Sequence, residues 1–390
     1  MNLANKSISA IFGVFFLEAA VLGNWIPRIP DMKEALSLSD AGLGVCLLAI
    51  PLGTMLGLLV AGRIIERTGL RQACQIFLPA WALAFVLPPF AQSQSVFIVF
   101  LLICGFAVGL IEVGMNTEAD RLEQSLGKRI MSRCHGFWSL GSMVGALVGG
   151  VFAHAGVSVS THFLIVMPII AAMGFWIASR LPQLPTSANG VADEATSLFR
   201  LPSKFILLLC VMPIGIMVVE GAFIDWSAVF VRSVLEASPL AISVIYSFFA
   251  IVMATFRLCG DAIGDRYSAK RIVQVSGVAA TLGIVIFALS PNIFVAMIGA
   301  AISGMGVAIV YPIAITAAAR RPGSSADNVA AITMVSFTAF LIAPPIIGFI
   351  SNAVGLRIAL LLLAPIAITT VFLAGEVGVK GQSDVLEESA

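Results

Sequence analysis

The chain has 390 residues, of which 59% are hydrophobic and only 11% are charged, and its formal net charge is +1. Its mean hydropathy is +1.03. A soluble domain carries roughly a quarter charged residues, so this composition excludes an ordinary soluble protein. A bilayer span needs about 20 mostly apolar residues, which leaves room for about twelve spans with short connections.

Twelve apolar segments of spanning length follow one another along the chain, so we expect an all-α membrane protein with twelve transmembrane helices. The expected spans are 7–27, 41–62, 73–91, 95–119, 131–154, 161–180, 204–231, 240–262, 271–290, 293–319, 327–351 and 355–375. The only long polar stretch separates six spans from six. We therefore expect an N-terminal six-helix bundle over 1–180, a cytoplasmic linker over 181–203, a C-terminal six-helix bundle over 204–378 and a cytoplasmic tail over 379–390.

Lysines and arginines lie mainly in the loops on one side of these spans. The opposite side holds only Arg28, Lys33, Arg232 and Arg357. Because cytoplasmic loops carry the excess of basic residues, we expect both termini in the cytoplasm. The expected location is a bacterial cytoplasmic (inner) membrane.

An internal repeat relates the two halves. Glu66, after the second span, and Asp265, after the eighth, are 199 positions apart. The same offset pairs Gly105 with Gly304, Arg121 with Arg320, Gly149 with Gly348, and Gly156 with Gly355. The repeat predicts two bundles related by a pseudo-twofold axis along the membrane normal.

The repeated loop carries a spaced set of glycine, acidic and basic residues. Its members are Gly62, Glu66, Arg67, Gly69 and Arg71, echoed by Asp261, Asp265 and Arg266. This pattern resembles the signature of the major facilitator superfamily. The resemblance implies transport by alternating access, with these residues forming a gate that latches the two halves at the cytoplasmic side. A loop that only fixes topology explains the arginines but not the acidic residues or the glycines.

Further stretches resemble the branch of this superfamily called MosC-like or YbjJ-like, with fucose permease as a more distant relative. They are Glu112–Glu118, His135–Gly141, Glu220–Trp226 and Tyr311-Pro312. The resemblance implies a transporter, and it leaves the substrate open.

Ionisable residues within a span are costly and usually face the bundle interior. Those present are Glu18, Glu112, His135, Glu220, Asp225 and Arg257. In the family fold, spans one, four, seven and ten line a central cavity, and three of them carry a carboxylate. Burial disfavours the charged form of a carboxylate, so its protonation can be coupled to occlusion. Glu112 and then Glu18 are the preferred proton carriers, with Glu220 and His135 as further candidates; a structural hydrogen-bonding role is the alternative for each.

Several polar and aromatic residues near these groups are candidate contacts to a substrate. They are Asn24, Trp25, Asn116, Trp138, Asp225, Trp226, Tyr246 and Tyr311. Asn116 lies one helical turn from Glu112 and shares its face. Aromatic rings can stack on a sugar or a cation, although packing is the better interpretation for any one of them. Arg257 is expected to pair with Asp261, one turn further along.

These features favour a proton-coupled symporter of a small polar solute such as a sugar, polyol or inositol derivative. The runner-up is a proton-driven exporter of cationic or apolar compounds, because Gly141, Gly145 and Gly149 resemble the fifth-helix motif of such exporters. A non-transporting membrane sensor is a third alternative. We expect no enzyme, since Asp261 and Asp265 share one helix end instead of facing each other. The expected partners are a small-molecule substrate, protons and the lipid bilayer; we expect a monomer with no cofactor, metal or nucleic acid.

Overall fold

The computed structural model describes residues 3–128, 130–182, 206–322 and 324–378. Over these residues the chain is helical and has no strand. Twelve of the described helical segments are long and apolar enough to cross a membrane, which confirms the expected all-α membrane fold. Of the expected linker, Leu181 and Pro182 are described, while 183–203 and the expected tail 379–390 lie outside the described residues.

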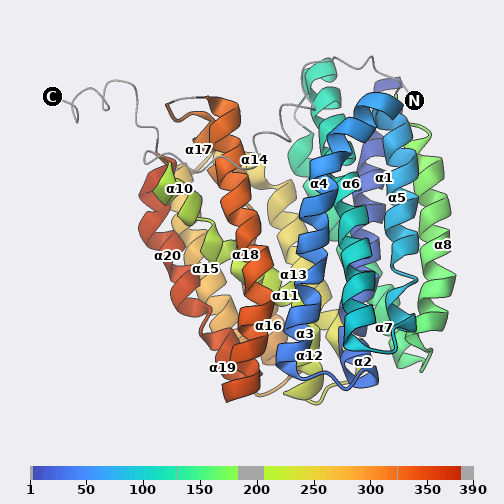
Figure 1. Ribbon diagram of the computed structural model, residues 1–390. Coiled ribbons are helices and arrows are strands. Elements are labelled where there is room, and N and C mark those ends of the chain that lie inside the picture. The colour runs from blue at the N-terminus through green and yellow to red at the C-terminus, as the bar shows by residue number, and fades with distance from the viewer. Residues whose placement is uncertain (1–2, 129, 183–205, 323, 379–390) are drawn as a thin grey trace.

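The first bundle, on the right in Figure 1, contains the helical elements of the first half. They are α1 (Leu3–Trp25), η1 (Ile26–Arg28), α2 (Ile29–Ala35), α3 (Asp40–Leu47), α4 (Ala49–Thr68), α5 (Leu70–Ala84), η2 (Pro88–Phe90), α6 (Gln94–Leu126), α7 (Met131–His154) and α8 (Val159–Ala178). Short helices follow α1 because Pro27 and Pro30 are the second residues of η1 and α2, within the first turn, where a missing N–H is tolerated. The first span therefore runs further than the sequence predicted.

The second bundle holds the remaining elements and has more broken helices. They are α10 (Leu207–Val211), α11 (Ile214–Asp225), α12 (Ser227–Ser233), α13 (Pro239–Leu258), α14 (Gly260–Gly264), α15 (Ala269–Leu289), α16 (Ile293–Val307), α17 (Val310–Ala319), α18 (Ser325–Val354), α19 (Leu356–Leu361), α20 (Ala364–Phe372) and η3 (Leu373–Val377). The seventh span is divided among α10, α11 and α12, and the tenth between α16 and α17. The eighth span ends at Leu258, earlier than predicted, and α14 follows as a separate turn.

Many helices start at a serine or asparagine whose side chain accepts a hydrogen bond from the first turn. These N-caps are Ser39, Ser93, Ser158, Ser238, Ser268, Asn292 and Ser324. Such a cap satisfies a backbone N–H that has no partner inside the helix. The caps therefore fix where the spans begin.

The 199-residue repeat corresponds to repeated packing. A Cβ added at Gly105 on α6 would meet the backbone of Ile50 on α4, and one at Gly304 on α16 would meet the backbone of Phe249 on α13. Only a small residue allows backbones to approach this closely. The fourth helix therefore packs on the second, and the tenth on the eighth, through equivalent glycines.

Helix α1 begins and α20 ends at the same face of the molecule, the upper one in Figure 1, which we call the terminal face. The opposite face, where α2, α12 and α19 lie, is called the far face. The bundles meet through two antiparallel helix pairs, α7 with α13 and α3 with α18. Helices α4 and α18 diverge toward the terminal face (Figure 1).

Contacts along α7 and α13 continue over most of their length. Toward the terminal face Ser132 donates to the carbonyl of Arg257 at 2.7 Å. Near the middle the hydroxyls of Ser142 and Tyr246 lie 2.8 Å apart. Contacts between α3 and α18 are different, because they lie near the far face, where Gly44 approaches the backbone of Pro345 and Gly348. The bundles are thus joined at the far face on both sides, but at the terminal face mainly along α7 and α13.

Candidate functional site

Glu18 on α1 is almost completely buried, with 2% of its surface exposed. The indole N–H of Trp138 on α7 donates to its carboxylate over 2.6 Å. The indole N–H of Trp81 on α5 donates to the Glu18 backbone carbonyl over 3.0 Å. Two neighbouring helices therefore fix both the backbone and the acidic group of this residue.

Glu112 lies on α6 of the first bundle. The amide of Asn116, one turn later, donates to the Glu112 carboxylate over 2.7 Å and to its backbone carbonyl over 2.9 Å. The predicted shared face of these two residues is therefore a direct contact. Glu112 also lies within electrostatic range of Glu18 and of Tyr311 on α17. Glu112 thus influences a carboxylate of its own bundle and a tyrosine of the other bundle electrostatically.

Arg257 on α13 has a different partner from the one predicted. Its guanidinium forms an ion pair with Glu220 on α11, with 3.0 Å between Nη2 and Oε1. Asp261 has no ion pair with any residue that the structure describes, so the expected pairing with Arg257 is wrong. The reason is that α13 ends at Leu258 and Asp261 lies, exposed, on the next short helix.

The same guanidinium makes two further hydrogen bonds. Nη1 donates to the hydroxyl of Ser139 on α7 over 3.0 Å, and Nε donates to the carbonyl of Ala308 over 3.2 Å. Ala308 lies at the break between α16 and α17. A broken helix leaves backbone groups without partners, and these must be satisfied from nearby. Arg257 therefore links α11, α13 and the α16–α17 break to the first bundle.

His135 on α7 lies beside this group. Its ring packs edge-on against Phe15, with 5.5 Å between centroids. The Ser139 hydroxyl, one turn further along α7, donates to the backbone carbonyl of His135 over 3.1 Å. His135 is also within electrostatic range of Arg257.

Asp225 ends α11, directly before the break that separates this helix from α12. Its side chain is half-buried and forms no hydrogen bond or ion pair with the described residues. It lies within electrostatic range of Tyr246 on α13. No side-chain capping bond is present at the start of α12.

Four of the predicted substrate contacts lie inside the helix packing. Asn24 is 1% exposed, and its amide is used by the carbonyl of Ala20 and the ring of His162, at 2.8 and 2.9 Å. Trp25 packs among the phenylalanines of the first bundle, and Trp226 is completely buried next to Gly348. The hydroxyl of Tyr246 forms a hydrogen bond with that of Ser142. These side chains hold helices together in the state described, and none is open to a solute there.

The glycines of α7 that resemble an exporter motif have a packing role. A Cβ at Gly141, Gly145 or Gly149 would meet the backbone of α1. The ridge that they form therefore lets α1 and α7 lie in close contact. This contact brings Glu18 within reach of Trp138.

The predicted gating residues lie at the terminal face. Those with exposed side chains are Glu66, Arg67, Asp261, Asp265 and Arg266. Gly62 is buried within α4, and Gly69 joins α4 to α5 with a φ of 80°. Neither Glu66 nor Asp265 has an ion pair among the described residues. The gating role of these residues therefore stays a prediction.

Glu118 on α6 was not singled out as a site residue, although it is 1% exposed. It lines a cavity of about 180 Å³ at the terminal face together with Gly69, Arg71 and Pro182. One oxygen of Glu118 and the Nε of Arg71 are buried without a hydrogen-bond partner. A carboxylate at the polar end of a long helix gives no sequence signal of burial.

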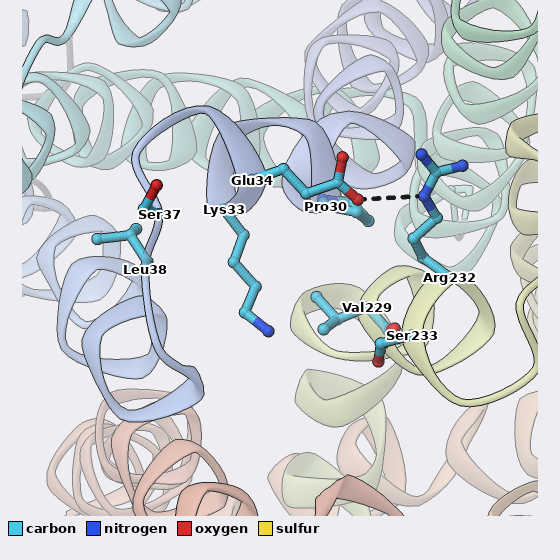
Figure 2. A pocket seen from close by; sticks show the side chains of 8 residues that line it. All are labelled: Pro30, Lys33, Glu34, Ser37, Leu38, Val229, Arg232 and Ser233. Atoms are coloured by element: carbon cyan, nitrogen blue, oxygen red, sulfur yellow. Dashed lines mark hydrogen bonds and ion pairs between the residues drawn. The ribbon is translucent and has the colours of Figure 1, made fainter.

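The far face carries charged contacts that the sequence also did not single out. Arg232 on α12 pairs with Glu34 on α2 over 3.2 Å, next to a pocket of about 270 Å³ that Lys33 enters (Figure 2). Lys33 also pairs with Asp40, which accepts a hydrogen bond from Ser351 on α18. The contacts of Arg232 with Glu34 and of Ser351 with Asp40 cross from one bundle to the other and close this face.

No group of three or more histidine, cysteine or acidic residues suited to a metal occurs in the described part of the chain.

Comparison with known proteins identifies the fold and its relatives. The sequence profile described as Major Facilitator Superfamily matches residues 11–339 and 226–382.

An uncharacterized MFS-type transporter of Yersinia pestis is 29% identical over 346 residues, which are 88% of this chain and 89% of the relative. The membrane protein MosC of Rhizobium meliloti is 29% identical over 369 residues, or 93% and 88% of the two chains.

Solved transporters share the architecture at low identity. The nucleoside transporter NupG superposes with a TM-score of 0.75 at 15% identity, covering 97% of this chain and 99% of NupG. The fucose:proton symporter FucP of E. coli gives 0.65 at 17% identity, covering 97% and 100%. At these identities the likeness concerns the fold alone.

Proposed function

Because the chain belongs to the Major Facilitator Superfamily, we propose that it is a secondary active transporter that imports a small polar solute together with protons by alternating access. A sugar, a polyol or an inositol derivative is the proposed class of solute. The terminal face is assigned to the cytoplasm of a bacterial inner membrane on the distribution of lysine and arginine.

One observation carries the proton coupling. Glu18 and Glu112 come from different helices of the first bundle and lie within electrostatic range of each other, and Glu112 also lies within electrostatic range of Tyr311 of the second bundle. Two nearby carboxylates repel when both are charged, so binding of a proton by one of them relieves the repulsion. Ionisable residues inside a membrane commonly belong to proton or substrate pathways. Glu112 and Glu18 are therefore proposed as the proton carriers.

The proposed solute follows from the charge around these residues. Arg257 is the one basic side chain placed among the carboxylates of this region in the described part of the chain, and Glu220 neutralises it. Because the positive charge of Arg257 is neutralised, a phosphate-bearing solute is disfavoured. Neutral hydroxyl groups, which can form hydrogen bonds with Glu112, Asn116 and Trp138, are favoured. The protein is proposed to be a monomer, since one chain with its two bundles contains a complete set of these residues.

The test uses purified protein in liposomes that enclose a pH-sensitive dye. A panel of sugars, polyols and inositol derivatives is first screened for thermal stabilisation, because a bound ligand stabilises the folded state. A stabilising solute is then added outside. A symporter carries protons inward with it and acidifies the lumen. Proton release from the lumen would identify an exporter, and solute binding without movement of either species would identify a sensor.

A further inference from the structure

Trp138 lies between two ionisable groups that belong to different bundles. Its indole N–H donates to Glu18 over 2.6 Å. The guanidinium carbon of Arg257 lies over its ring, 5.9 Å from the centroid. A cation within about 6 Å of an indole centroid is attracted by the ring. One side chain therefore binds a carboxylate of α1 and lies within cation–π range of an arginine of α13.

Arg257 is held firmly in the second bundle. Its side chain is 13% exposed and that of its partner Glu220 is 6% exposed, so water screens their attraction little. Three different nitrogen atoms of the guanidinium donate hydrogen bonds to Glu220, Ser139 and Ala308. The planar guanidinium can donate to three acceptors at fixed angles at once, whereas a lysine ammonium acts as a point charge.

We propose that Arg257 is a positioning residue that transmits the protonation state of Glu18, through Trp138, to α11 and the α16–α17 break of the second bundle. Glu220 is then the counter-ion of Arg257 and not a carrier of protons. This inference rests on the proposed proton coupling and names the side chains through which that coupling reaches the other bundle.

The physical basis is the difference between two hydrogen bonds. An N–H that donates to a charged carboxylate forms a bond roughly twice as strong as one to a neutral acceptor. Protonation of Glu18 therefore weakens the hold on the indole of Trp138. A shift of this ring changes its contact with Arg257. Because Arg257 also binds Ser139 and Ala308, the shift alters the contact between the bundles.

Other charged groups face the same residues. Glu112 on α6 is the carboxylate within electrostatic range of Glu18. On α7, His135 is within electrostatic range of Arg257. From α5 the contact is the neutral Trp81, and on α8 His162 binds Asn24 further along α1. Tyr246, on α13 itself, lies within electrostatic range of Arg257 and Glu220.

The experiment needs no substrate. Spin labels are placed at the terminal face on Lys128→Cys and Lys270→Cys, both exposed, in a background in which the exposed Cys259 is replaced by Ser. The distance distribution between the labels is measured in lipid nanodiscs across a range of pH. The variants are Trp138→Phe, which keeps a ring but loses the N–H, and Arg257→Lys, which keeps the charge.

Matched controls are available for both variants. Trp81→Phe also removes an indole hydrogen bond to Glu18, but this bond goes to the backbone carbonyl. Arg357→Lys removes an arginine that donates to Ala288 and Ser290 inside the second bundle.

The proposal expects the distance distribution of the parent to change with pH, and both controls to keep its midpoint. In Trp138→Phe the midpoint rises by about 1 pH unit, because a hydrogen bond that favours the charged carboxylate is lost. In Arg257→Lys the amplitude of the change falls by at least about half, since the lysine cannot hold three acceptors. A Trp138→Phe or Arg257→Lys profile equal to that of the parent overturns the proposal, as do equal changes in the controls or a parent profile that is independent of pH.

These results can be separated from failure of the proposed function. Solute uptake driven by a pH gradient tests the proton coupling itself. Normal coupled uptake together with an unaltered Arg257→Lys profile overturns only the role of Arg257.

Discussion

Ser351 on α18 donates a hydrogen bond to Asp40 on α3, and this contact joins the two bundles at the far face. Asp40 also pairs with Lys33, and the two side chains are 20% and 22% exposed. The neighbouring pair of Glu34 and Arg232 is much more open, with 58% and 37% exposed. Exposed ion pairs contribute about 0–1 kcal/mol because water and salt screen them. The shielded contact therefore dominates closure of this face.

Replacing Ser351 by Ala is expected to favour opening of the far face. The substitution removes the hydrogen bond that Asp40 receives from the second bundle among the described residues, a loss of about 1 kcal/mol because Asp40 keeps Lys33 and is partly open to water. Spin labels at Ala35→Cys and Ala353→Cys, both exposed, report the separation. Ser351→Ala should add a longer distance, whereas Glu34→Gln should leave the distribution unchanged. A larger effect of Glu34→Gln would reverse the ranking of the two contacts.

Gly348→Ala is expected to open the same face for a steric reason. A Cβ at this position would lie 2.6 Å from the carbonyl oxygen of Asp40 and 3.1 Å from the Cα of Gly44. The backbones of α3 and α18 must then separate. The labels at Ala35 and Ala353 should report a longer main distance, and Gly264→Ala, which would meet nothing within 4 Å, should not change it. An unchanged distance in Gly348→Ala would show that the two helices adjust without opening.

The bond between Tyr246 and Ser142 predicts a measurable coupling between the bundles. Both side chains are buried, so Tyr246→Phe leaves the serine hydroxyl unsatisfied and should lower the free energy of unfolding by about 1 to 2 kcal/mol. The double variant with Ser142→Ala should lose less than the sum of the two single variants. Thermal unfolding of the four proteins in one detergent measures this coupling. Additive losses would mean that the hydroxyls do not bind each other.

The gating residues predict a shift of the access equilibrium. Glu66 and Asp265 are exposed and have no ion pair among the described residues, so replacing them should not destabilise this state. The latch that the sequence predicts forms when the terminal face closes. Glu66→Ala and Asp265→Ala should therefore enrich the long distance between labels at Lys128 and Lys270, with no change in melting temperature. Asp120→Ala is the control, because Asp120 is also an exposed acidic residue but lies on α6, outside the gating loops. If both gating variants match that control, the latch must be abandoned.

The architecture was predictable because its signals are local or periodic. Twelve apolar segments, a 199-residue repeat and the Gly62 to Arg71 loop each appear directly in the sequence. The contact of Glu112 with Asn116 was also predictable, since residues one turn apart share a helix face.

The partners of Glu18 and Arg257 were not predictable in this way. Trp138 lies 120 positions from Glu18, and Glu220 lies 37 positions from Arg257, so no periodicity joins them. Local reasoning paired Arg257 with Asp261 because it assumed a continuous helix. The end of α13 at Leu258 and the break at Ala308 depend on packing between helices, which a single sequence does not encode as a pattern.

Glu112 is proposed to carry the coupled proton, and replacing it by glutamine isolates this role. Glu112→Gln keeps the size of the side chain and can still bind Asn116, but it can neither gain nor lose a proton. In proteoliposomes loaded with the identified solute, this variant should lose at least about 90% of the uptake driven by a pH gradient, since a carrier that cannot release its proton cannot reset. Exchange of solute at equal concentrations needs no net proton movement and should retain most of its rate. Full gradient-driven uptake by Glu112→Gln would contradict the account and would move the coupling to Glu18.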